Sequence, residues 1–359
     1  MHGTKAQMLL EHPVFDLIRH HQSVKLAETS DPFPPAFNPH LNDGVEYRAV
    51  SACTGTDMAN GKSMMAAYAF YNGIEDGFIT LGTTVVESSS GNTGPEMEKI
   101  ALELGLNMRL VLKQSMPPPK LDRARVLSSD RVHTELVTRE GAHLAREIGK
   151  QPGFYNPDQY GRDWNPHAQA TFVAPQVFRG NEDAAAAFVL GGSCGTPLGF
   201  KRYVEKVGLR TEVHMVVAVG HEDLSGGKNL HQLKSDVLHN VFAVFPEESI
   251  LRAPRYQSNL LSWLSWPYVV KRERGLRFMF GQSFGATVFA AFDWVEARKK
   301  DGKLDSYRSP DGKVVVLTFG MDDYQGYTNI YLSELEDQVL GSPRSLPPLE
   351  ELLKFDRTA

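Results

Sequence analysis

The chain has 359 residues, 42% of them hydrophobic and 23% charged, with a formal net charge of -5. This length suits two domains of roughly 150–200 residues, and the composition is that of an ordinary globular protein. The negative charge argues against nucleic acid as a partner. With only two cysteines, and no run apolar enough for a signal peptide or a membrane span, we expect a cytoplasmic protein with no membrane partner.

From about residue 47, apolar runs typical of strands alternate with runs typical of helices. Strands are predicted at residues 47–53, 83–86, 107–113, 133–138, 186–190, 213–219, 276–280 and 314–319. Helices are predicted at residues 64–71, 95–104, 120–128, 140–150, 197–207, 257–272 and 285–299. This alternation predicts βαβ units with mainly parallel sheets. The first 40 residues give no clear pattern beyond an irregular segment at Pro32–Pro35, and the Pro/Gly-rich stretch 151–166 is interpreted as a domain junction or active-site loop.

The segment Glu87–Gly94, with the sequence Glu-Ser-Ser-Ser-Gly-Asn-Thr-Gly, connects a predicted strand to a predicted helix. Its small hydroxyl residues, two glycines and one amide leave backbone N–H groups accessible, and a helix N-terminus adds partial positive charge. The segment is therefore suited to hold an anion such as a carboxylate or a phosphate. Taken alone, it could equally be an ordinary Ser/Gly connection.

Two further turns lead from a predicted strand into a predicted helix. Gly191–Thr196 has the backbone donors of a phosphate cradle, in which the N–H of Cys194 would matter more than its sulfur; a structural tight turn is the alternative. Gly281–Ala286 places Ser283 at or near a helix N-cap, and capping alone could explain that serine.

Lys62 lies in the sequence Gly61-Lys62-Ser63, which is similar to the end of a nucleotide-binding P-loop. That motif needs four residues between its first glycine and Gly-Lys, whereas five residues separate Gly55 from Gly61, so the match fails. Two interpretations stay open. Lys62 lies on a solvated helix face, or it forms a Schiff base in a partly desolvated site.

Taken together, Lys62 and the three turns resemble, in order and spacing, the fold-type II pyridoxal-phosphate enzymes. The group most similar is that of cysteine synthase and cystathionine β-synthase. Gln159-Tyr160, Asn165-Pro166 and Pro175 also resemble the Gln-Phe and Asn-Pro stretch of that group. The resemblance extends from about residue 47 to residue 319.

The resemblance implies a role for each matching residue. Lys62 would hold pyridoxal 5'-phosphate as an internal aldimine and then move the substrate α-proton. Asn92 would hydrogen-bond to the 3′-oxygen of the pyridine ring, and Ser283 would face the ring nitrogen. The cofactor phosphate would be held by Gly192, Ser193, Cys194, Gly195 and Thr196. The substrate carboxylate would be held by Ser89, Ser90, Thr93 and Gln159.

A serine opposite the ring nitrogen has a consequence for the reaction. A hydroxyl does not stabilise a protonated ring nitrogen as a carboxylate would, so the ring is a weaker electron sink. This favours α,β-elimination, through an aminoacrylate, over racemisation or transamination. Addition of a nucleophile then gives β-replacement, whereas water gives a keto acid and ammonia.

The chain departs from the group's pattern around the substrate. Ser63-Met64 follows the lysine in place of Asp-Arg, the region 218–234 lacks a Gly-Ile-Gly loop, and Gly320–Tyr324 replaces a Ser-Gly turn. The N-terminal Asn-Thr-Pro-Leu signature is not visible. We therefore expect a specialised β-substituted-alanine synthase or lyase rather than a housekeeping cysteine synthase.

The sequence thus predicts an α/β protein with two three-layer αβα domains, residues 1–175 and 176–359, and an active site in the cleft between them. The predicted activity is β-elimination or β-replacement on a serine- or cysteine-like amino acid by a homodimer, with no metal; His221–Asp223 is interpreted as a solvated loop. The alternatives are a simple ammonia-lyase or desulfhydrase, a nucleotide-binding P-loop protein, and a non-catalytic relative.

Overall fold

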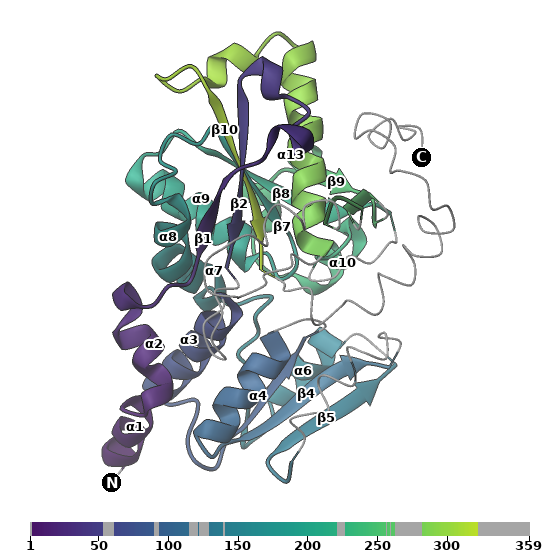
Figure 1. The fold of residues 1–359 in the computed structure, drawn as a ribbon. Coiled ribbons are helices and arrows are strands. Elements are labelled where there is room, and N and C mark those ends of the chain that lie inside the picture. The colour runs from purple at the N-terminus through teal and green to yellow at the C-terminus, as the bar shows by residue number, and fades with distance from the viewer. Residues whose placement is uncertain are drawn as a thin grey trace, which may run out of the picture.

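The computed structural model describes residues 2–52, 61–89, 93–114, 121, 129–138, 141–220, 227–255, 257–258, 260–262 and 282–321. Several predicted features lie wholly or mostly outside these residues, namely Ser90, Asn92, the loop 221–223, the helices at 120–128 and 257–272, and the strand at 276–280. Two β-sheets lie in separate lobes of the molecule (Figure 1).

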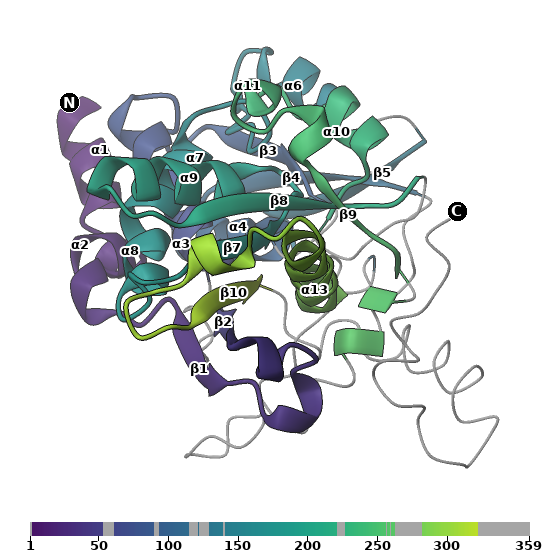
Figure 2. The same ribbon diagram turned by 90° about the horizontal axis from the view of Figure 1, so that it is seen from above.

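The larger sheet has the strand order β1-β2-β10-β7-β8-β9 over the described residues. Its strands are β1 (Glu28–Pro32), β2 (Val45–Ser51), β7 (Ala186–Leu190), β8 (Glu212–Ala218), β9 (Leu251–Ala253) and β10 (Val314–Gly320). β1 is antiparallel to β2, and every other neighbouring pair is parallel. Figure 2 shows β8, β7, β10, β2 and β1 side by side in this order.

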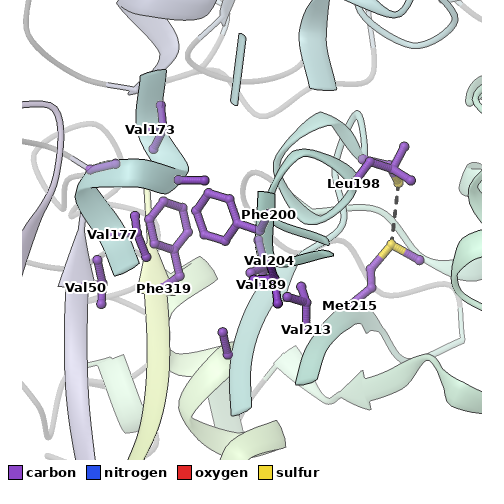
Figure 3. Packing of buried hydrophobic residues seen from close by; sticks show 14 of the residues in the cluster. Val50, Val173, Val177, Val189, Leu198, Phe200, Val204, Val213, Met215 and Phe319 are labelled. Carbon is purple, nitrogen blue, oxygen red and sulfur yellow. Dashed lines mark hydrogen bonds between the residues drawn. The ribbon is translucent and has the colours of Figure 1, made fainter. Parts of the chain in front are cut away.

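Helices cover both faces of this sheet because its strands are apolar on both sides. In β10, Val315 and Phe319 pack in the cluster that contains α9 (Gly195–Val207) and α8 (Ala174–Phe178). Val314 and Val316 point the opposite way, into the cluster that contains α13 (Gln282–Lys300). Figure 3 shows Phe319 against Phe200 of α9; the ring centroids are 4.9 Å apart, edge to face. Because successive side chains of a strand point to opposite faces of the sheet, helices pack on both faces and the lobe has three layers.

The smaller sheet has the order β5-β4-β3-β6, and all its pairs are parallel. Its strands are β3 (Thr84–Ser88), β4 (Asn107–Lys113), β5 (Val132–Val137) and β6 (Phe154–Tyr155). One face packs against α3 (Gly61–Glu75) and α4 (Thr93–Glu103), and the other against α6 (Gly141–Gly149). This sheet is therefore also the middle of three layers, as the sequence predicts.

The remaining described helices are short. They are α1 (His2–Leu10), α2 (Asp16–Arg19), α7 (Trp164–Ala168), α10 (Leu230–Asp236) and α11 (Val241–Val244), with a π-turn at Gln169–Val173 between α7 and α8. No helix within the described part of the chain has the length and apolarity needed to cross a bilayer. The first 40 residues, which showed no pattern, contribute α1, α2 and β1.

The predicted elements agree closely with the observed ones wherever the structure describes them. β4 and β7 have the predicted bounds, and α9 begins two residues earlier than predicted. The predicted domain division at residue 175 stays a prediction. In the observed sheets, β1 and β2 pair with the strands of the C-terminal half, because β10 lies in parallel register against β2, with Val314 opposite Val45.

Candidate active site

A cleft of about 700 Å³, partly open to solvent, lies between the two sheets at the carboxyl ends of their parallel strands. Ligands of open α/β sheets bind at this edge because loops and helix N-termini converge there. Nine of the residues predicted for the site line the cleft, namely Lys62, Ser89, Thr93, Gln159, Gly192, Ser193, Cys194, Thr196 and Ser283. These residues span more than two hundred positions of the sequence.

Lys62 is the second residue of α3 and is half-buried. The next residue, Ser63, is fully buried, and its hydroxyl donates to Glu96 Oε2 on α4 at 2.8 Å. The start of α3 is therefore tied to the helix that follows the Ser89–Thr93 loop. This bond uses the serine at which the sequence departs from the pattern of the group that it resembles.

Gln159 is held by hydrogen bonds to the end of β3. Its Nε2 donates to the carbonyl of Ser88 at 2.8 Å, and its backbone N–H donates to Glu87 Oε2 at 3.1 Å. The other oxygen of Glu87 accepts from the backbone N–H of Ser88 at 2.8 Å. Burial, with the charge of Asp158, raises the pKa of Glu87 to about 8, against the opposing effect of these two hydrogen bonds.

The turn between β7 and α9 carries backbone strain at Cys194. Its φ is +64°, in the left-handed region that favours glycine. Its sulfur lies 3.7 Å from Met215 Sδ within the core, the contact marked by the dashed line at Met215 in Figure 3. Burial raises the pKa of the Cys194 thiol to about 12. The thiol therefore stays protonated and packed in the core.

Asn165 joins the glycine turn to the Gln159 segment. Its Nδ2 donates to Ser193 Oγ at 2.9 Å and to the carbonyl of Gln159 at 2.8 Å. Gly195 is the predicted residue that is described but does not line the cleft. A Cβ at this glycine would lie 2.0 Å from Asn165 Oδ1, so the helix can start here only without a side chain. Gly195 thus serves the close approach of Asn165.

Ser283 lies in the first turn of α13, where its side chain is buried and lines the cleft. Its Oγ has no hydrogen-bond partner among the described residues. A buried hydroxyl without a partner costs free energy and calls for a ligand or another explanation. Helix capping, the alternative for this serine, does not account for it because Oγ accepts no such bond within the described residues.

Among the described residues, eight others that were not predicted as site residues line the cleft, namely Tyr160, Val189, Leu190, Pro197, Gly227, Lys228, Phe319 and Met321. Tyr160 follows Gln159 directly, and Gly227-Lys228 follows the strand β8. Their position after strand ends, or beside residues predicted to bind the cofactor or substrate, is the feature of the sequence from which they could have been predicted.

The comparisons with known proteins agree with this geometry. A family model described as "Pyridoxal-phosphate dependent enzyme" matches residues 59–240, just over half of the chain. A probable cysteine synthase of Bacillus subtilis (strain 168) is 26% identical over 264 residues, which cover 68% of this chain and 76% of that protein. An N-(2-amino-2-carboxyethyl)-L-glutamate synthase of Ralstonia nicotianae is 30% identical over 172 residues, covering 44% of this chain and 49% of that protein.

A solved structure extends the agreement to the fold. The crystal structure of O-ureido-L-serine synthase superposes with a TM-score of 0.65, covering 90% of this chain and 98% of the other at 15% identity. Both lobes are thus those of fold-type II enzymes, with the cysteine synthase group among the similar proteins. The chain therefore belongs to the family of pyridoxal-phosphate dependent enzymes.

Proposed function

We propose that this protein catalyses β-elimination or β-replacement on a serine- or cysteine-like amino acid, with pyridoxal 5'-phosphate bonded to Lys62. One observation carries the proposal. A single cleft gathers Lys62, Ser89, Thr93, the glycine turn after β7 and the buried Oγ of Ser283, which has no hydrogen-bond partner among the described residues. These are the groups that the cofactor and an amino-acid substrate need. The family match covers residues 59–240, which include Gly61-Lys62-Ser63, and it favours a pyridoxal-phosphate enzyme over a nucleotide-binding P-loop protein.

The residues of the cleft fit the cofactor. Ser283 Oγ, which has no hydrogen-bond partner in the described part of the chain, would hydrogen-bond to the ring nitrogen. The turn Gly192–Thr196, at the N-terminus of α9, would hold the phosphate through backbone N–H groups. Asn92, outside the described residues, is proposed to contact the 3′-oxygen. When bound, the cofactor would withdraw electrons from the substrate α-carbon and acidify its proton.

The protein's own groups would then do three things. Ser89, Ser90, Thr93 and Gln159 would orient the substrate carboxylate, Lys62 Nζ would accept the α-proton, and the buried walls would exclude water. Ser283, being neutral, would not hold a charged ring nitrogen. That choice disfavours long-lived charge at the α-carbon and so favours departure of a β-substituent.

The names of the similar proteins support the substrate class. Cysteine and O-ureido-L-serine are both alanines substituted at the β-carbon, and two of the similar proteins are described as their synthases. The departures around the substrate favour a specialised synthase or lyase. We further propose a cytoplasmic homodimer; light scattering of the purified protein at twice the chain mass of 39.9 kDa would support the dimer.

The bond to Lys62 can be tested directly. Protein reconstituted with pyridoxal 5'-phosphate should absorb near roughly 410–420 nm, as Schiff bases of this cofactor do, and borohydride should label Lys62. Lys62→Ala should lose both signals, whereas Lys206→Ala, at an exposed lysine of α9, should keep them. Labelling at another lysine would contradict the assignment.

A panel of L-serine, O-acetyl-L-serine, O-phospho-L-serine and L-cysteine tests the reaction. At least one should change the absorbance of the bound cofactor, and mass spectrometry with added nucleophiles should reveal a β-substituted alanine. Ammonia and a keto acid formed without any nucleophile would instead favour the simple lyase. No response to any of the four would contradict the proposed substrate class.

A further inference from the structure

We propose that Lys228 is a specificity-determining residue, whose ammonium pairs with an anionic β-substituent of the substrate. This inference rests on the proposed function and narrows its substrate class to amino acids that carry a negatively charged group beyond the β-carbon. It is drawn from three observations, namely how the backbone of Lys228 is held, what surrounds its ammonium, and which wall of the cleft it occupies.

The backbone places Lys228 at the ends of two strands. Its N–H donates to the carbonyl of Gly191 at 2.9 Å, and its carbonyl accepts from the N–H of Ala218 at 3.2 Å. Gly227 before it packs so closely that a Cβ there would lie 2.7 Å from the side chain of Leu190. The backbone of Lys228 is therefore held between the carboxyl ends of β7 and β8, and its side chain lines the cleft.

The ammonium group of Lys228 is largely buried, and some of its N–H groups have no acceptor among the described residues. Its side chain is 12% exposed, and Nζ donates to Asp236 Oδ2 at 2.5 Å. On another side, Nζ lies 5.0 Å from the centroid of the Tyr160 ring. Asp236 is the hydrogen-bond acceptor of Nζ among the described residues, so N–H donors of the ammonium stay available to a ligand.

The charges on the cleft wall favour an anion. The described lining residues with a formal charge are Lys62 and Lys228, and none carries a carboxylate. In the proposed function, Lys62 is bonded to the cofactor and so does not pair with an anionic group of the substrate. Lys228, which also pairs with Asp236, is then the cation of the described wall that is left to meet a substrate group, in a partly buried site where charge-assisted hydrogen bonds are strong.

The contact of Nζ with the Tyr160 ring places the ammonium beside the proposed substrate site. Nζ lies over Tyr160, the neighbour of Gln159, which is proposed to hold the substrate carboxylate. The proposed phosphate site, Gly192–Thr196, supplies backbone N–H groups of its own at a helix N-terminus. We therefore assign Lys228 to the part of the substrate that extends past the carboxylate and the β-carbon.

The test uses the holoenzyme and matched ligands. Dissociation constants are measured from the absorbance of the bound cofactor for O-phospho-L-serine against O-acetyl-L-serine, and for L-glutamate against its neutral isostere L-glutamine. Wild type should prefer the anionic member of each pair. Lys228→Met should weaken the anionic ligands about tenfold or more, the cost of one charge-assisted hydrogen bond, and the neutral ligands far less.

Three further variants keep the test decisive. Lys228→Arg should retain the preference, and Asp236→Asn, which removes the counter-charge, should bind the anionic ligands at least as well as wild type. Lys234→Met, at a lysine of α10 that is 53% exposed, is the control and should bind every ligand as wild type does. If Lys228→Met does not fold, the arginine and Asp236 variants carry the test.

Each outcome has one meaning. Equal weakening of both members of a pair, or no preference in wild type, overturns the role of Lys228 and leaves the proposed function standing. Loss of the cofactor from Lys228→Met, with unchanged ligand preference, also overturns it, because the lysine would then serve the cofactor phosphate. No absorbance change with any amino acid in wild type contradicts the proposed function itself.

Discussion

Glu87 and Gln159, 72 positions apart in the sequence, meet behind the cleft, where the buried carboxylate accepts the backbone N–H of Gln159. The second oxygen of Glu87 accepts the N–H of Ser88, and Gln159 Nε2 returns a bond to the carbonyl of Ser88. The two segments proposed to hold the substrate carboxylate are thus joined by two hydrogen bonds, and the third fixes the Glu87 side chain within its own segment. Glu87 does not line the cleft and acts as a positioning residue.

Glu87→Gln should weaken substrate binding without releasing the cofactor. The amide nitrogen of glutamine cannot accept a hydrogen bond, so one of the two backbone N–H groups loses its acceptor. We expect KM for the amino acid to rise about tenfold, with a smaller change in kcat and an unchanged cofactor absorbance. Glu103→Gln, at an exposed position of α4, is the matched control. A proportional fall in kcat at constant KM would contradict the positioning role.

Two buried carboxyl groups should make the fold less stable as the pH rises. Burial raises the pKa values of Glu87 and Glu98 to about 8, from an ordinary value of 4.5. Between these values the folded protein binds more protons than the unfolded chain, so the free energy of unfolding falls as the pH rises from about 5 to 8. Each unit of pKa difference corresponds to about 1.4 kcal/mol.

Glu98→Gln isolates one of these groups, because both Glu98 oxygens are buried without a hydrogen-bond partner among the described residues. Urea denaturation at pH 5.5 and pH 8 should show a smaller loss of stability in this variant than in wild type. Glu103→Gln should retain the wild-type slope. Parallel slopes in Glu98→Gln and wild type would show that Glu98 keeps an ordinary pKa in the folded state.

Cys194 should tolerate glycine and reject a β-branched residue. At φ +64°, glycine avoids a backbone cost of about 1 kcal/mol, which offsets the lost contact between the sulfur and Met215. We expect the stability of Cys194→Gly to lie within about 1 kcal/mol of wild type and Cys194→Val to lose about 2 kcal/mol or more, measured by urea denaturation. Equal stability of the two variants would argue against strain at this turn.

Gly285→Ala should damage the site of Ser283 through the backbone. A Cβ at Gly285 would lie 1.7 Å from the carbonyl oxygen of Ser258, and the Gly285 N–H donates to Ser262 Oγ at 2.9 Å. The start of α13 must shift to relieve this clash, so we expect a loss of about 2 kcal/mol or more and weaker cofactor binding. Gly82→Ala, where no atom lies within 4 Å of the added Cβ, should match wild type. Normal cofactor affinity in Gly285→Ala would disprove the coupling.

Local patterns predicted most of the longer strands and helices of the described core, and the family resemblance built on them predicted the candidate site. β4 and β7 are continuous apolar runs because parallel strands are buried on both faces, and such runs are visible without any knowledge of the fold. The turns that follow β3 and β7 are readable for a similar reason, since small residues and glycines between a strand and a helix leave backbone donors accessible. Lys62 was predicted through the resemblance that it and those turns share, in order and spacing, with the fold-type II enzymes.

The position of β1 and β2 and the place of Lys228 in the cleft wall were decided by contacts between distant parts of the chain. β2 joins the larger sheet through its register with β10, some 270 residues later, and no local pattern encodes such a pairing. Lys228 follows β8 and reaches Tyr160 only because the two lobes meet at one edge of their sheets. Periodicity and turn chemistry act over a few neighbouring residues, whereas the wall of a cleft is assembled from segments that packing alone brings together.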